Sequence, residues 1–452
     1  MRQAQKITEP KTLQLPYSPE AEKAVLGLIL AGSDKLSELS SSAKISADCF
    51  YTNEHRLIFQ TILDIDDEGL EYDFITVNER LAKSGFTNIE YLTDLMTQAP
   101  LTLKIDHYID IVRKNYYLRR IIHSCRETSR KAAHVDGDVK DFIAEVEKEF
   151  LAIAGEQDKE GGLTSASDTV SSTLVELERR LSQDSDVTGL SSGFTDLDYF
   201  TGGWQKSDLV ILAARPGMGK TALALNWLIN AVKDNKSHAV IFSLEMSKEQ
   251  LMERLISAQG RIDSTKLRKG NLSDDEQDKL MYAVRGLHAF GNRLMIDETP
   301  GISLFEVRSR CRRYKKEHGL DLIIIDYLQL MTGSVQAQKQ NREREISEIS
   351  MGLKALAKEL AVPVIALAQL NRGPDARPDK KPKISDLRES GSMEQDADQI
   401  MFVYRDEYYN PESEFAGKAE VMIAKNRHGE VGSCLLAWQP NYVSFFNLLK
   451  DH

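Results

Sequence analysis

The most constraining feature of this chain is a short glycine-containing segment between an apolar run and a helical pattern. The apolar run Leu209–Ala213 predicts a buried strand, and Ala222–Trp227 predicts the helix that follows. Between them lie Ala214, Arg215, Pro216, Gly217, Met218, Gly219, Lys220 and Thr221. A strand, a glycine turn and a helix start place backbone N–H groups where they can hold phosphates. We therefore predict a nucleoside triphosphate site, in which Lys220 contacts the terminal phosphates and Thr221 binds Mg²⁺.

From Thr188 onward, short apolar runs alternate with helical patterns. This alternation predicts an α/β domain whose mainly parallel sheet is covered by helices on both faces. We predict strands at Leu209–Ala213, Ala239–Leu244, Leu322–Ile325, Val364–Ala368, Ile400–Tyr404 and Val421–Ala424. Ligands of such sheets lie at the carboxyl ends of the strands, so the glycine segment follows its strand where a ligand is expected.

The first half of the chain has a helical pattern instead, and we predict an all-α domain over residues 18–153. Ser18 with Pro19 predicts a capped helix start. Thr76 with Glu79 predicts a capping box ahead of a later helix.

The segments that flank these domains differ from them in composition. We expect residues 1–17 to form a flexible tail and residues 154–187 to link the helical domain to an α/β domain at 188–452. The linker contains a helical seam of Val170, Leu174, Leu177 and Leu181. A helix this short is not stable alone, so its seam needs a partner surface within the chain or on a neighbouring subunit.

The chain has 452 residues and a net charge of −11. This charge argues only weakly against a nucleic-acid partner, because phosphate binding depends on local basic patches. One basic cluster contains Arg308, Arg310, Arg312, Arg313, Lys315 and Lys316, and a second contains Arg372, Arg377, Lys380, Lys381, Lys383 and Arg388. Each is either a solvated surface or a phosphate-binding patch, and charge alone leaves the choice open.

Composition also bears on where the protein acts. No apolar stretch approaches the roughly 20 residues of a membrane helix, and the first residues lack the apolar core of a signal peptide. The cysteines lie far apart without a CxxC pair, which favours free thiols over a zinc site. We therefore expect a cytoplasmic protein with no membrane partner.

Three polar residues lie at the ends of predicted strands. Asp326 can hold Mg²⁺ through water and so contribute to the same metal site as Thr221. Glu245 can polarise a water for attack on the γ-phosphate, although a helix-capping acid is the alternative. Gln369 can sense the γ-phosphate through its amide, and a buried structural glutamine is the competing interpretation.

A basic pair, Lys425 and Arg427, follows the predicted strand Val421–Ala424. Such residues suit stabilisation of transition-state charge, and an arginine of this kind can be supplied by a neighbouring subunit. A solvated basic turn explains the local sequence equally well.

The segment Asp386–Ser392 is polar, contains glycine and is flanked by basic residues. Its backbone amides and Arg388 can hold a phosphate chain, but an ordinary surface loop is the alternative. No aromatic residue interleaves with it, so base stacking is not indicated.

Longer runs of the sequence resemble the bacterial DnaB-type replicative DNA helicases. In the second half these runs are Thr188–Leu190, Gly193-Phe194, Leu197-Asp198, Thr201–Trp204, Asp208-Leu209, Ala213–Pro216, Ser243–Ser247, Ile325–Leu330, Gln369–Arg372, Asp386–Ser392 and Glu394–Asp398. Tyr17–Leu30 and Asp48–Tyr51 resemble the amino-terminal domain of that family, so the resemblance covers nearly the whole chain.

This resemblance implies a ring-shaped homohexamer of RecA-like motor domains that uses ATP and carries a collar of amino-terminal domains. The nucleotide would lie between subunits, with one side formed by Lys220, Thr221, Asp326 and Glu245. Lys425 and Arg427 would reach in from the next subunit. The loop that tracks single-stranded DNA would contain Arg388, Glu389 and Gly391.

The resemblance also implies that ATP hydrolysis moves the ring 5′ to 3′ along one DNA strand and displaces the other. The linker helix would dock on a neighbouring subunit. Expected partners are a primase and a helicase loader, which would act through the collar and the linker. Ser207 departs from the family pattern, since the family usually has glycine there, whereas Ala214 is common in the family.

Two other functions share a RecA-like core. One is a DNA-binding filament of the recombinase kind that nucleotide switches on and off, and the other is an ATPase that phosphorylates or remodels proteins. The long helical first half, the linker helix and the Arg388–Ser392 loop favour the helicase.

Overall fold

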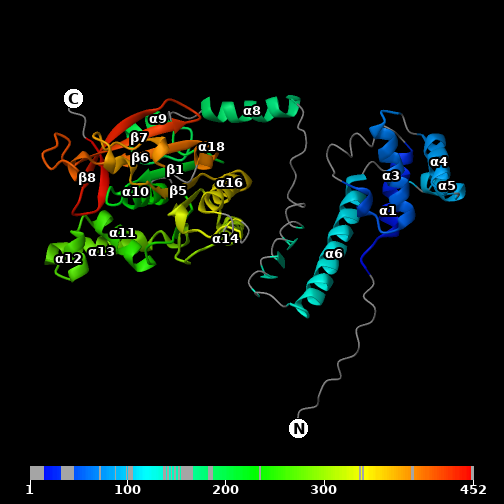
Figure 1. Cartoon of the computed structure of the whole chain (residues 1–452), viewed down its shortest axis with the longest axis horizontal. Coiled ribbons are helices and arrows are strands. Elements are labelled where there is room, and N and C mark those ends of the chain that lie inside the picture. The colour runs from blue at the N-terminus through cyan, green and yellow to red at the C-terminus, as the bar shows by residue number, and fades with distance from the viewer. Residues whose placement is uncertain are drawn as a thin grey trace, which may run out of the picture. The chain divides into compact units, whose positions relative to one another are not determined.

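The computed structural model describes residues 15–448, apart from residues 32–44, 71–72, 87, 98, 100–104, 182–186, 234–235, 335–336, 338–340, 388–390 and most of 136–165 (Figure 1). The chain forms two compact units, Met1–Leu174 and Val175–His452. No helix among the described residues is long and apolar enough to cross a membrane.

The amino-terminal unit is built from helices, as the sequence predicts. Its elements are α1 (Pro19–Leu30), η1 (Ala47–Cys49), α3 (Asn53–Asp67), α4 (Phe74–Lys83), α5 (Ile89–Thr97) and α6 (Ile105–Ala132), and α8 (Ala166–Leu181) includes residues of both units. Helices α1, α3, α4, α5 and α6 share one apolar core, to which α1 contributes Val25 and Ile29 and α3 contributes Ile58 and Ile62.

Side chains decide where two of these helices begin. Ser18 accepts a backbone hydrogen bond at 3.4 Å and Pro19 lies in the first turn, so the predicted start of α1 is confirmed. The predicted capping box of Thr76 and Glu79 is wrong, because α4 begins earlier and Asp73 accepts a hydrogen bond from the Thr76 N–H at 2.7 Å. The Asp73 carboxylate satisfies a helix-start N–H group that would otherwise lack a partner.

A buried polar chain connects three helices of this unit. His55 in α3 lies 2.6 Å from Glu22 in α1 and 2.7 Å from the Tyr91 hydroxyl in α5. Burial raises the pKa of Tyr91, and the nearby carboxylates of Glu54 and Glu22 raise it further. Each buried polar group thereby has a partner, so the chain links α1, α3 and α5 without leaving an unpaired charge.

The carboxy-terminal unit is organised around a nine-stranded sheet in the order β3-β2-β4-β5-β1-β6-β7-β8-β9. The strands are β1 (Leu209–Ala214), β2 (Ala239–Ser243), β3 (Leu294–Asp297), β4 (Leu322–Asp326), β5 (Val364–Gln369), β6 (Gln399–Tyr404), β7 (Lys418–Asn426), β8 (Gly432–Gln439) and β9 (Ser444–Asn447). Strands β1 to β6 pair in parallel, and β7, β8 and β9 are added antiparallel. The α/β fold is confirmed, with a mixed sheet.

All six predicted strands are present, but the strand predicted at Val421–Ala424 is longer and runs over Lys418–Asn426. Its burial alternates along the strand, because one face packs on the core and the other is partly exposed. An apolar run therefore marks only the middle of this strand. Strands β3, β8 and β9 were not predicted.

Helices cover both faces of the sheet, as expected. They are α9 (Thr195–Thr201), α10 (Lys220–Lys233), α11 (Lys248–Gly260), α12 (Ser264–Lys269), α13 (Asp274–His288), α14 (Leu304–His318), α16 (Arg342–Leu360), α17 (Gly373–Ala376) and α18 (Gly391–Asp396), with short turns η2 (Gly291–Arg293), η3 (Leu328–Leu330), η4 (Ile384–Asp386) and η5 (Asp406–Tyr408). In β1, Val210 and Leu212 pack into the core that contains α10, whereas Leu209 and Ile211 pack into the core that contains α14 and α16.

Ser207, where a glycine was expected, has a φ of 69° just before β1. This left-handed conformation favours glycine, so a serine here costs conformational free energy that other contacts must offset. The Ser207 carbonyl accepts a hydrogen bond from Lys354 of α16 at 2.7 Å, which fixes the residue between α16 and the start of the sheet.

Candidate functional site

The phosphate loop lies between β1 and α10, in the predicted strand–loop–helix context. Strand β1 ends at Ala214 and α10 begins at Lys220. Gly217 and Gly219 have φ values of 82° and 97°. A Cβ atom at Gly219 would lie 2.8 Å from the ring of Phe445, so both backbone conformation and space require glycine there.

Thr221 and Lys220 meet Asp326 at the carboxyl edge of the sheet. The Thr221 hydroxyl donates a hydrogen bond to Asp326 Oδ2 at 2.8 Å, and Lys220 Nζ lies 3.6 Å from Asp326 Oδ1. Strands β4 and β1 both run parallel to β5, which lies between them, so their carboxyl ends share one edge. The structure thus brings together the predicted loop and the predicted carboxylate.

Asp326 has the properties of a residue that holds Mg²⁺. Its side chain is 1% exposed, and Oδ1 accepts no hydrogen bond from any described residue. A carboxylate oxygen and the Thr221 hydroxyl are hard oxygen donors, which fit Mg²⁺. Burial lowers the pKa of Lys220, although the charges of Asp326 and Glu245 oppose that shift.

Glu245 lies two residues beyond β2, next to this group. Its charge acts on Lys220 and on Tyr327, whose ring lies 4.6 Å from Lys220 Nζ. The alternative role of a helix cap is wrong, because Ser247 caps α11 and forms a capping box with Gln250. Glu245 is exposed beside the phosphate loop, where it can contact a water molecule.

Arg254 of α11 belongs to the same group and was missed in the sequence. Burial lowers its pKa, while the charges of Asp326 and Glu245 oppose the shift. Arg254 lies one helical turn from the buried Leu251 and next to the buried Leu255. A basic residue on the core-facing side of an amphipathic helix was the available signal.

Gln369 ends β5 beside the start of the phosphate loop, since it pairs with Ala214 in the sheet register. Its side chain is exposed, so the alternative of a buried structural glutamine is wrong. Gln329 contacts its backbone N–H and carbonyl at 3.3 Å each and fixes the strand end. The Gln369 side chain is thus exposed at a strand end that adjoins the start of the loop.

Lys425 and Arg427 lie at the opposite edge of the sheet. Asn426 pairs with Gln399 in antiparallel β6–β7, and Gln399 pairs with Val210 in parallel β6–β1, near the beginning of β1. The phosphate loop follows the other end of β1. Lys425 is part of β7 rather than of the turn after it, which corrects the predicted boundary.

The side chain of Lys425 is hydrogen-bonded within its own chain. Its Nζ atom donates to the carbonyls of Glu394 and Ala397, at 2.5 Å and 2.7 Å, around the end of α18. The Arg427 side chain is 67% exposed. Arg427 is therefore largely exposed to solvent beside Asp398, whereas Lys425 connects β7 to α18.

Of the predicted DNA-contacting residues, Arg388 and Glu389 lie outside the described residues. Gly391 is exposed and begins α18. The loop between η4 and α18 thus ends on the helix that Lys425 contacts.

Several residues of the two basic clusters are ion-paired. In the first, Arg308 and Arg312 both pair with Glu359, and Arg310 pairs with Asp297. In the second, Arg377 pairs with Asp386 and Lys381 with Glu420. At these paired positions, a solvated, ion-paired surface is favoured over a phosphate-binding patch.

Comparison with known proteins matches two family models to the chain. The DnaB-like helicase N terminal domain matches residues 14–114, and the DnaB-like helicase C terminal domain matches residues 189–447. The first of these ranges lies in the amino-terminal unit and the second in the carboxy-terminal unit.

Relatives match over nearly their full length. Replicative DNA helicase DnaC of Bacillus subtilis is 42% identical over 441 residues, covering 96% of this chain and 95% of the relative. Replicative DNA helicase DnaB of Haemophilus influenzae is 42% identical, covering 99% and 97%. A solved DnaB-like replicative helicase, described with its interactions with primase, has a TM-score of 0.68 at 35% identity and covers 96% and 100%. These matches favour the helicase over the two alternative functions.

We expect Lys220→Ala to lower ATP turnover with single-stranded DNA by about a hundredfold or more, because a positive charge at the terminal phosphates is lost. Phosphate release measures turnover, and light scattering checks that assembly is unchanged. The matched control is Lys233→Ala, at the exposed end of the same helix, which should keep wild-type turnover. Wild-type turnover in Lys220→Ala would exclude this lysine from the site.

Proposed function

The chain belongs to the family of DnaB-like replicative DNA helicases, and we propose that it acts as a homohexameric ring that moves 5′ to 3′ on single-stranded DNA. The helicase activity itself is that of an ATP hydrolase coupled to DNA. The observation that supports the ring most strongly is the separation of the phosphate loop and Arg427 on opposite edges of one sheet. A chain arranged in this way needs a second copy to complete its site.

Within one subunit, the loop from Ala214 to Thr221 holds the phosphates of ATP. Thr221 and Asp326 would hold Mg²⁺, which when bound would neutralise charge on the phosphates of ATP. Lys220 contacts the terminal phosphates. Glu245 accepts a proton from the attacking water, and Gln369 contacts the γ-phosphate and reports its loss.

From the neighbouring subunit, Arg427 enters this site and stabilises the charge that develops on the γ-phosphoryl group. Its exposure in a single chain supports this role. Lys425, near the end of β7, adds positive charge, and its contacts with α18 connect β7 to the proposed DNA loop. Hydrolysis in one site is thereby coupled to DNA in the channel.

Arg388, Glu389 and Gly391 form the loop that follows the DNA strand, with Arg388 paired to a phosphate. Contacts to the backbone rather than to bases make binding independent of sequence, as a moving helicase requires.

Residues 18–153 form the collar domain and residues 154–187 the linker, which joins the motor domain at 188–452. The exposed seam of α8 supports docking of this helix on a neighbouring subunit, because Leu174, Leu177 and Leu181 are 53%, 45% and 86% exposed. Primase and a helicase loader bind through the collar and linker. The interactions of the related helicase with primase support primase as a partner.

Unwinding of a forked DNA substrate tests the motor and its direction together. With ATP and Mg²⁺, we expect strand displacement that stops when streptavidin blocks the 5′ tail and continues when it blocks the 3′ tail. A ring that threads onto the 5′ tail explains this asymmetry. Displacement that instead requires a free 3′ tail would reverse the proposed polarity.

Mixing two inactive variants tests whether each site is shared between subunits. Arg427→Ala should bind ATP but lower turnover by about a thousandfold. In mixed rings with Lys220→Ala, some sites receive a wild-type loop from one subunit and a wild-type Arg427 from the other. We therefore expect turnover to reappear on mixing. An inactive mixture whose subunits do co-assemble would mean that each site is complete within one chain.

Arg388→Ala tests the DNA loop. Loss of one phosphate contact should weaken single-stranded DNA binding equally across sequences and reduce the salt slope of log K by about one. Fluorescence anisotropy at several salt concentrations measures both quantities. Arg285→Ala, on the exposed surface of α13, is the matched control. An unchanged affinity and slope would remove Arg388 from the DNA path.

A further inference from the structure

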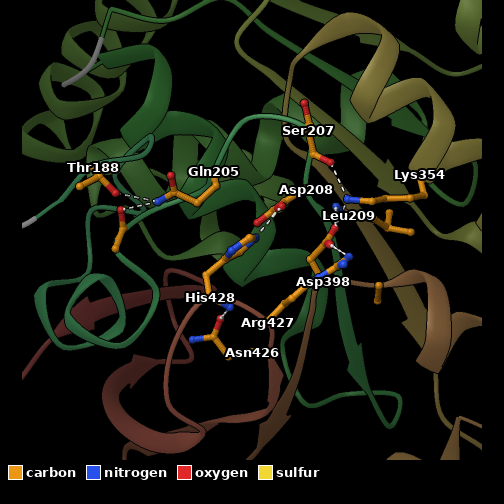
Figure 2. A network of polar contacts seen from close by, with 12 residues as sticks. Thr188, Gln205, Ser207, Asp208, Leu209, Lys354, Asp398, Asn426, Arg427 and His428 are labelled. Atoms are coloured by element: carbon orange, nitrogen blue, oxygen red, sulfur yellow. Dashed lines mark hydrogen bonds and ion pairs between the residues drawn. The ribbon is translucent and has the colours of Figure 1, made fainter. Parts of the chain in front are cut away.

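The turn after β7 is held by a polar cluster at the edge of the sheet opposite the phosphate loop (Figure 2). Asn426 Nδ2 donates to the Phe200 carbonyl at 3.0 Å, and the Arg427 backbone N–H donates to the Asp398 carbonyl at 2.9 Å. His428 lies next to a second carboxylate. Three consecutive residues are thus anchored separately, which fixes the direction of the turn.

Asp398 supplies the negative charge behind Arg427. Its carboxylate accepts a hydrogen bond from the Leu209 N–H at 2.8 Å, pairs with Lys354, and lies 3.3 Å from Arg427 Nη1. Burial raises the pKa of Asp398, but the hydrogen bonds from Lys354 and from the Leu209 N–H outweigh it and hold this pKa below its ordinary value. Asp398 is therefore ionised at neutral pH and gives the guanidinium group a fixed counter-ion.

His428 anchors the same turn to Asp208, the residue before β1. His428 Nε2 lies 3.0 Å from Asp208 Oδ1, and Asp208 is 4% exposed. The second oxygen, Asp208 Oδ2, has no hydrogen-bond partner among the described residues. Burial raises the pKa of Asp208, and the hydrogen bond from His428 opposes this shift. Without His428, a buried carboxyl group would lose its donor, which is costly unless the turn moves.

Asp208, Asp398 and His428 together have the spacing of a cation site. Ligand atoms of Asp208, Asp398 and His428 lie within 4.8 Å of one another. However, Lys354 and Arg427 both already pair with the Asp398 carboxylate. A divalent cation here would lie beside two positive side chains, which is electrostatically unfavourable. The charge balance favours an anchoring role over metal binding.

We propose that His428 is a positioning residue, whose hydrogen bond to Asp208 sets the direction in which the turn presents Arg427 to the neighbouring subunit. This inference rests on the proposed function, in which Arg427 completes the neighbour's site. Stabilisation of developing charge depends on a preorganised donor, so a turn that has lost one of its three anchors would lower turnover without removing the arginine. His428 itself touches no nucleotide and acts through Arg427.

Steady-state ATP hydrolysis with single-stranded DNA tests this role in the full-length assembly. His428→Ala should lower kcat about tenfold while the KM for ATP stays near its wild-type value. His428→Gln should recover most of the loss, because the glutamine amide can donate to Asp208 in place of Nε2. The matched control is His288→Ala, at the exposed end of α13, which should keep the wild-type kcat.

The same substitution is then made in an Arg427→Lys background, which keeps the charge but loses the guanidinium fork. If His428 acts through Arg427, the loss caused by His428→Ala should be much smaller in this background. Equal losses in both backgrounds, or a wild-type kcat for His428→Ala, would overturn the inference. Where His428→Ala does not assemble, Asp208→Asn tests the same coupling from the other side of the hydrogen bond. Wild-type turnover in Arg427→Ala would refute the shared site itself, which is a separate failure.

Discussion

The reversal of strand direction between β6 and β7 is the constraint on which the site depends. The parallel strands end at one edge, and this brings Thr221, Asp326 and Glu245 together around the phosphate loop. The antiparallel β7 returns the chain to the other edge and carries Arg427 with it. The proposed catalytic centre uses both edges and would therefore require two copies of the chain, and repetition of one head-to-tail contact closes into a ring when the rotation allows it.

The phosphate-loop edge concentrates charged side chains around the buried carboxylate of Asp326. Lys220 and Arg254 both have pKa values lowered by burial, and the carboxylates of Asp326 and Glu245 oppose the shifts. The oxygen Asp326 Oδ1 accepts no hydrogen bond from the described residues. The partly desolvated side chains of Lys220 and Arg254 favour binding of a polyanion. The oxygen of Asp326 that accepts no hydrogen bond favours binding of its metal ion.

The sequence predicted the parts whose signal is local and missed those that depend on neighbours. The strand–loop–helix around Lys220 was predicted, because apolar runs and Gly-Lys-Thr lie side by side in the chain. Strand β3 was missed, since it is short and only partly buried. The capping box at Thr76 was wrong because Asp73 competes for the same N–H group. The cluster around Asp398 joins residues nearly two hundred positions apart in sequence, as its bond to Leu209 shows, so no spacing rule reveals it.

The two bonds from Lys425 to the carbonyls of α18 have a thermodynamic consequence. These bonds join the end of β7, which precedes Arg427, to α18, which follows residues 388–390. A shift of either element therefore changes the free energy of the other. Such linkage is reciprocal: whatever factor the polynucleotide applies to nucleotide affinity at the interface, the nucleotide applies to polynucleotide affinity. In the proposed helicase, the nucleotide bound by a subunit and the affinity of that subunit for DNA would therefore depend on the same conformational equilibrium.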